Sequence, residues 1–156
     1  MAKEFTLKFD LALEKLMKVD ITVGDKAEMG VGRAMLQLKT DTMKQIPTVP
    51  IREGFLRGSA SIHVQSQELP VPPTPKKSGG LCPTDKKVQG YQIPLQSNRI
   101  IGLIGFNVPY AARMHEVPAN FSDREAGNKY LESKMANNKM IYKQIIVNAI
   151  NEGSVA

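Results

Sequence analysis

One apolar stretch constrains the fold of this chain more than any other part of its sequence. It runs from Ile100 to Val108 (IIGLIGFNV) and is nearly continuous in β-branched, aliphatic and aromatic residues, which predicts a central strand buried on both faces. Gly102 and Gly105 within it indicate a bulge or a close approach of another backbone. Pro109 then favours a short helix over 110–116, because the first helical turn does not need the N–H group that proline lacks.

Apolar residues at helical spacing predict two helices near the N-terminus. The first is a short amphipathic helix that Gly24 ends, and its apolar face is formed by Phe9, Leu13, Leu16 and Met17. The second repeats this spacing through to about Gln45, with apolar positions at Ala27, Val31, Ala34, Met35 and Leu38. Its two glycines, Gly30 and Gly32, indicate either a close crossing with another element or a locally frayed helix.

The middle and end of the chain predict a small sheet followed by a helix. Apolar residues alternate with polar ones over 59–65, which predicts a strand with His63 facing solvent or a polar interface, and residues 88–94 predict another strand. A C-terminal helix of about 20 residues should begin near Tyr130 and pack on the sheet. Because the order is helix, helix, sheet, helix, we expect one α+β domain over 1–156 with a small antiparallel sheet.

A long Pro-rich segment separates two of the expected strands. Residues 67–87 (QELPVPPTPKKSGGLCPTDKK) contain five prolines and two glycines and have almost no apolar periodicity. This composition predicts a stiff, projecting loop. Loops of this length in compact domains are usually functional or disordered.

Composition and charge restrict the possible functions. The lone Cys82 excludes an internal disulfide framework and a cysteine-built metal site. No stretch approaches the roughly 18 apolar residues of a membrane span, and the N-terminus has charges where a signal peptide is apolar, so we expect an intracellular protein with no membrane contact. The net charge of +6 is spread thinly, with adjacent basic pairs only at Lys76-Lys77 and Lys86-Lys87. This pattern predicts weak, non-specific attraction to nucleic acid.

The search for catalytic chemistry finds one pair of residues. His63 and His115 lie on different predicted elements, and only His115 has a neighbouring carboxylate, Glu116. This pair could be a general base with its orienting group, or a hydrogen-bonded corner between helix and loop. We favour the corner, with Tyr110 burying its ring there. No phosphate loop, nucleophile elbow or metal-ligand spacing is present, so we expect no catalytic residue, cofactor or metal.

Three segments of the chain resemble a known family. The segment GFLRGSASIHV, Gly54 to Val64, is similar to the "glycine-x-leucine-arginine-x-serine" signature of small neck proteins of tailed bacteriophages, the head–tail joining or tail-completion family. VPYAARMHE, Val108 to Glu116, resembles the "tyrosine-alanine, then histidine or glutamate" segment that follows the last main strand of that family. AGNKYLESKM, Ala126 to Met135, resembles the start of its closing helix.

The resemblance implies a non-enzymatic protein of the virion, made in the host cytoplasm. Such proteins form a ring, commonly sixfold, between the portal side of the head and the tail tube, and the genome passes through its lumen. A ring needs heterologous contacts that close, and we expect the Pro-rich loop to supply one side of them. The expected interface residues are Val71, Pro72, Pro73, Pro75, Lys76, Lys77 and Leu81.

Two other classes of protein stay open at this point. One is a small nucleic-acid-binding module, which would bind DNA tightly at moderate salt. The other is a small enzyme of unknown class, for which His115 and Glu116 are the available residues. The ring subunit is the function that we expect from the sequence.

Overall fold

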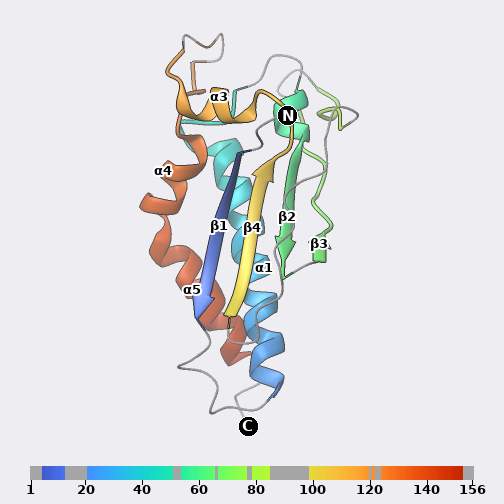
Figure 1. Cartoon of the computed structure of the whole chain (residues 1–156), viewed down its shortest axis with the longest axis vertical. Coiled ribbons are helices and arrows are strands. Elements are labelled where there is room, and N and C mark those ends of the chain that lie inside the picture. The colour runs from blue at the N-terminus through green and yellow to red at the C-terminus, as the bar shows by residue number, and fades with distance from the viewer. Residues whose placement is uncertain are drawn as a thin grey trace.

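The structure is a computed structural model of the whole chain, and its layers are shown in Figure 1. The described residues form a four-stranded antiparallel sheet with α1 and α5 on one of its faces, and the short α3 crosses one end of it. The predicted α+β class is therefore confirmed. The structure describes residues 5–12, 21–50, 54–65, 67–76, 79–84, 99–119, 121 and 124–152.

The predicted central strand is β4 (Arg99–Phe106), and it lies inside the sheet. The strand order is β1-β4-β2-β3, with β1 (Phe5–Ala12), β2 (Ala60–Val64) and β3 (Gln67–Leu69). From Ile100 to Phe106 the residues of β4 are buried on both faces, as their apolar character predicts. Ile100, Ile104 and Phe106 belong to the main core, and Ile101 and Leu103 form a second apolar cluster.

The first N-terminal helix was wrongly predicted. Residues 5–12 form β1, which pairs along its whole length with β4 from Phe5 opposite Phe106 to Ala12 opposite Arg99. The sequence FTLKFDLA is apolar at every second residue, so it fits the period of a strand as well as that of a helix, and pairing with the apolar β4 decides between them. The remaining residues of the expected helix, 13–20, lie outside the described residues.

The second predicted helix is α1 (Ile21–Lys44), and it begins earlier than expected, with Gly24 inside it. Its five predicted apolar positions are all buried. Val31 and Met35 contact the central strand at Gly102, where an added Cβ would lie 2.7 Å from Val31 Cγ1. Gly102 therefore makes room for two side chains of α1, whereas the sequence predicts a bulge or a close approach of another backbone there.

The glycines of α1 mark a close helix crossing, the first of the two alternatives. A Cβ at Gly30 would lie 3.0 Å from Ala149 Cβ and 3.0 Å from Ile146 Cα, so α1 and α5 (Lys139–Asn151) pack almost backbone to backbone. The C-terminal helix does begin at Tyr130, but it is divided into α4 (Tyr130–Asn137) and α5 by Asn138. It lies on the same face of the sheet as α1 (Figure 1).

The second predicted strand, β2, is more buried than its sequence indicates. His63 was expected at solvent or a polar interface, but it is only 7% exposed. It lies opposite Leu103 of β4 and Glu68 of β3 in the sheet. Within the described part of the chain its Nδ1 has no hydrogen-bond partner. The predicted strand is present, but both its apolar and its polar residues are buried. The strand expected at 88–94 lies outside the described residues.

Candidate functional site

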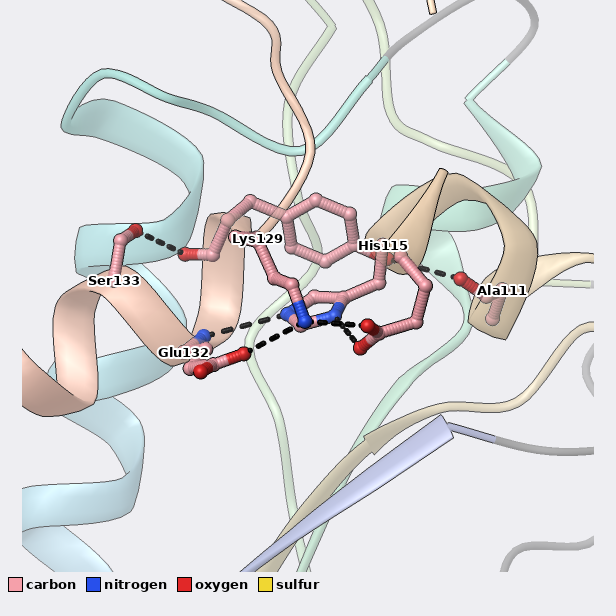
Figure 2. A network of polar contacts seen from close by, with 7 residues as sticks. Ala111, His115, Lys129, Glu132 and Ser133 are labelled. Atoms are coloured by element: carbon pink, nitrogen blue, oxygen red, sulfur yellow. Dashed lines mark hydrogen bonds and ion pairs between the residues drawn. The ribbon is translucent and has the colours of Figure 1, made fainter. Parts of the chain in front are cut away.

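The predicted corner is built where β4 leads into α3 (Ala111–Glu116) and the chain returns to α4. Figure 2 shows the polar contacts that join α3 to the start of α4. Lys129 donates its backbone N–H to the His115 carbonyl at 2.7 Å. Lys129 has φ of 56°, a left-handed conformation that is uncommon for lysine, and α4 begins at the next residue. The two helices are thus joined backbone to backbone at His115.

His115 is fully buried at this junction. Its Nε2 accepts the backbone N–H of Glu132 at 3.4 Å, so the proton of a neutral ring is on Nδ1, which lies 2.7 Å from Glu116 Oε1. Burial lowers the pKa of His115, although the hydrogen bond to Glu116 opposes the shift. The imidazole is therefore held neutral, with both nitrogens engaged, and this arrangement favours a positioning role over proton transfer to a substrate.

Carboxylates and a lysine surround the exposed side of this ring. Lys129 Nζ contacts Glu116 Oε2 and lies 3.0 Å from Glu132 Oε2. The lysine lowers the pKa of Glu116, and the two carboxylates raise the pKa of Lys129. His115, Glu116 and Glu132 place three possible metal-ligand atoms within 4.8 Å of one another. However, the Lys129 ammonium already supplies a positive charge between the two carboxylates.

Glu132 is the residue of this cluster that the sequence did not reveal. It is separated from Glu116 by a loop, and no spacing rule connects the two positions. Glu132 reaches the cluster because the left-handed backbone of Lys129 precedes α4, whose start is bonded back to α3. A lysine in a sequence does not indicate that conformation, so the sequence gives no signal for Glu132. The prediction of no metal-ligand set follows from sequence spacing alone, whereas the structure places Glu132 beside His115 and Glu116.

The role expected for Tyr110 belongs instead to Tyr130. Tyr110 is 42% exposed, so the expected burial of its ring was wrong. It directly precedes α3, and the next residue, Ala111, is fully buried. Tyr130 is fully buried and packs edge-on against Phe106 (5.4 Å between ring centroids) and His115 (4.9 Å). Its hydroxyl donates to the Ala111 carbonyl at 3.5 Å, and burial raises its pKa.

The Pro-rich segment was expected to project, but much of its described part docks on its own domain. After β3 the chain runs along the sheet edge towards α2 (Phe55–Gly58) (Figure 1). Lys39 Nζ donates to the Pro72 carbonyl at 2.9 Å, and Thr74 and Cys82 are buried. The backbone N–H of Cys82 donates to the Thr74 carbonyl at 2.7 Å. We call the described residues 70–76 and 79–84 the arm.

The expected interface residues divide into two groups on the arm. Pro72, Pro73, Pro75 and Leu81 are exposed, whereas Val71 and Lys76 are half-buried. Lys77 lies outside the described residues. The arm thus presents one side to its own domain and the other to solvent, and the exposed side contains most of the residues expected at an interface.

A pocket of about 700 Å³ lies between the arm and the body of the domain. Lys39, Arg57 and Cys82 line it, and all three are at least nine-tenths buried. Arg57 donates from Nε to the Val49 carbonyl at 2.9 Å, and Lys39 donates from Nζ to the Pro72 carbonyl of the arm at 2.9 Å. Burial raises the pKa of the Cys82 thiol despite the nearby Arg57, Lys76 and Lys39. The two cations therefore fix backbone segments, and the thiol stays protonated at neutral pH.

Comparisons with known proteins give no further assignment. No family model matches this sequence, no curated protein is similar to it, and no solved structure matches its fold. None of the helices in the described part of the chain combines the length and apolar character that crossing a bilayer requires.

Proposed function

We propose that this chain is a structural subunit of a ring in the neck of a tailed bacteriophage, between the DNA-filled head and the tail. One observation supports it above the others. The first of the three segments that resemble the neck family is distant in sequence from the other two, yet in the structure all three meet at one end of the sheet.

Specific contacts join these three segments. Asn107, which directly precedes the second segment, donates its backbone N–H to the Ser59 carbonyl at 3.1 Å and its side-chain amide to Ser61 Oγ, so the start of the second segment is held against the first. The third segment is tied to the second by the Tyr130 ring on His115 and by the backbone bond from Lys129 to His115. A shared structural corner gives a physical reason for the three patterns to occur together in one chain.

The polar groups of the corner and of the pocket support a structural role. His115 is buried and neutral with both nitrogens engaged, and the cations that line the pocket donate to backbone carbonyls. These groups hold segments of chain in place. At the same time the domain exposes large apolar side chains, including Met29 at 50%, Ile46 at 70% and Met140 at 73%. Such residues are favourable at contacts with other subunits.

The proposed partners follow from this role. Copies of the chain would form a ring, as a hexamer, with neighbouring portal-side and tail-tube proteins above and below it. Genomic DNA would pass through the lumen without strong attachment, since the net charge of +6 is dispersed. Tight DNA binding that persists at moderate salt would favour the nucleic-acid-binding module instead.

Interruption of the gene in the virus that carries it tests the proposal. We expect filled heads and separate tails in electron micrographs of the lysate, and joined particles when the wild-type gene is supplied in trans. The purified protein should also show rings with a central channel. Joined, infectious particles that lack this protein would refute the neck assignment.

A further inference from the structure

A shallow groove runs between α1 and the edge strand β3, on the side of α1 that faces away from α5. It has a volume of about 470 Å³ and is mainly apolar, with two carboxylates towards the N-terminal end of α1. We call it the α1–β3 groove. Its lining includes Asp25, Glu28, Met29, Gly32, Leu36 and Leu69.

The outward face of α5 is also apolar in part, but its charged residues are basic where those at the end of the groove are acidic. Met140, Ile141 and Val147 are 73%, 53% and 46% exposed, which is unusual for large apolar side chains that occur together on one helix. Lys139 and Lys143 are also exposed, and they share one side of the helix with Met140 and Val147, whereas Ile141 is turned about 100° or more away. We call Lys139, Met140, Lys143 and Val147 the α5 ridge.

The groove and the ridge lie on opposite sides of the domain. On α1, Gly30 faces α5, where an added Cβ would touch Ala149 and Ile146. Gly32 faces β3, since a Cβ there would lie 3.0 Å from Leu69 Cδ1. Figure 1 shows α5 and β3 on either side of α1. A contact between the groove of one copy and the ridge of another is therefore heterologous, and such contacts propagate from copy to copy into a ring where the rotation closes and into a filament where it does not.

Charge and size both match the two surfaces. Asp25 and Glu28 make one end of the groove acidic. Arg33 also lines the groove, but its charge is paired with Glu152 at 2.6 Å. The ridge is basic, so ridge against groove pairs opposite charges, whereas ridge against ridge or groove against groove opposes like charges. At 1.5 Å per helical residue the ridge is about 12 Å long, and the α1 side of the groove is about 16 Å long, so the ridge fits within it.

We propose that the α5 ridge of one copy docks in the α1–β3 groove of the next copy, and that this is the contact that closes the ring. The inference rests on the proposed function for the closed ring, but the pairwise contact itself can be tested in solution. Apolar side chains supply the buried area, and the charges fix which surface meets which.

Disulfide trapping between copies gives the test. In a Cys82→Ala background, which removes the chain's only thiol, Met29→Cys and Val147→Cys are combined in one protein and oxidised mildly. We expect a ladder of covalent oligomers, because every copy offers both halves of the contact. Each single variant should stay monomeric. The matched control pairs Val147→Cys with Val117→Cys, which is 49% exposed but lies on neither surface, and should give no ladder.

The outcomes separate this inference from the neck assignment. A dimer from Val147→Cys alone, a dimer from Met29→Cys alone, or no product from the pair would overturn the ridge-in-groove contact. A ladder together with normal particles after gene interruption would retain the contact and refute the neck role. As a second measurement, Glu28→Lys or Lys143→Glu alone should weaken self-association by roughly fivefold, and combining the two should restore it.

Discussion

A glycine at the end of α2 provides the sharpest test of how the arm is held. Gly58 lies directly under the returning part of the arm, and a Cβ added there would be 1.9 Å from the Pro83 carbonyl oxygen and 2.8 Å from the Pro83 carbonyl carbon. The overlap is with backbone, so no side-chain rotation can relieve it. Gly58→Ala must therefore displace either α2 or the 82–84 segment.

The cost of this substitution can be worked from the contacts that it threatens. Forcing an extra methyl group into a packed region costs typically 1–3 kcal/mol. Undocking the arm instead exposes Cys82 and Thr74 and loses the hydrogen bond from the Lys39 ammonium to Pro72, and bonds to charged groups contribute about 1.5–3 kcal/mol. Both routes predict a loss of about 2 kcal/mol in the free energy that holds the arm closed.

Cys82 reports this loss directly, because its thiol is the only one in the chain and is 5% exposed. Its reaction with a maleimide requires opening of the arm, so a loss of about 2 kcal/mol should raise the labelling rate by about 30-fold. Circular dichroism and a denaturant titration of the same protein separate local opening from global unfolding.

Gly32→Ala is the matched control. It also adds one methyl group, but the nearest atom is the flexible end of Leu69 at 3.0 Å, and an alanine inside α1 favours the helix by up to about 1 kcal/mol. Its labelling rate should equal that of the wild type. If Gly58→Ala also labels at the wild-type rate and unfolds within about 0.5 kcal/mol of it, the tight docking of the arm on α2 is refuted.

Two further predictions concern buried polar groups. The pKa of His115 is lowered in the folded protein, so the unfolded chain takes up a proton first as the pH falls through 6.5, and the free energy of unfolding should decline from there towards pH 5. His115→Asn should flatten this part of a curve of unfolding free energy against pH. An equal slope in the two proteins would contradict the assignment of this pH dependence to His115. Tyr142→Phe removes a 2.7 Å hydrogen bond to the buried Asp41 carboxylate, so the urea unfolding free energy should fall by about 2 kcal/mol, and no change would show that Asp41 is satisfied without it.

The main core could be predicted from the sequence because its signals are redundant. The strand at 100–106 is apolar throughout, and the α1 positions recur at one helical period over several turns. In contrast, residues 5–12 satisfy both periods at once, and only their pairing with β4 selects the strand. Local pattern therefore fails where a partner strand, distant in sequence, decides the structure.

The candidate corner shows a similar limit. The sequence predicts a short helix over 110–116 and α3 spans Ala111–Glu116, but the buried ring there is that of Tyr130 and not that of Tyr110. Proline at 109 indicates where a helix starts and says nothing about which side of its first turn faces the core. Tyr130 and Glu132 join the corner through a loop whose path depends on the left-handed Lys129. A contact of this kind, between residues of two separate helices, cannot be predicted from the sequence of either helix alone.

The docked arm changes how its part in assembly should be tested. A deletion of residues 71–85 would remove the exposed prolines, but it would also remove the buried Thr74 and Cys82 and leave Lys39 without its Pro72 acceptor. Loss of assembly could then follow from damage to the domain itself. An arm that is already ordered loses little entropy when a neighbour binds its outer side, so its exposed side chains can still contribute to a contact. Substitution of Pro73 or Leu81, which are exposed, changes that outer side while the inner contacts stay in place.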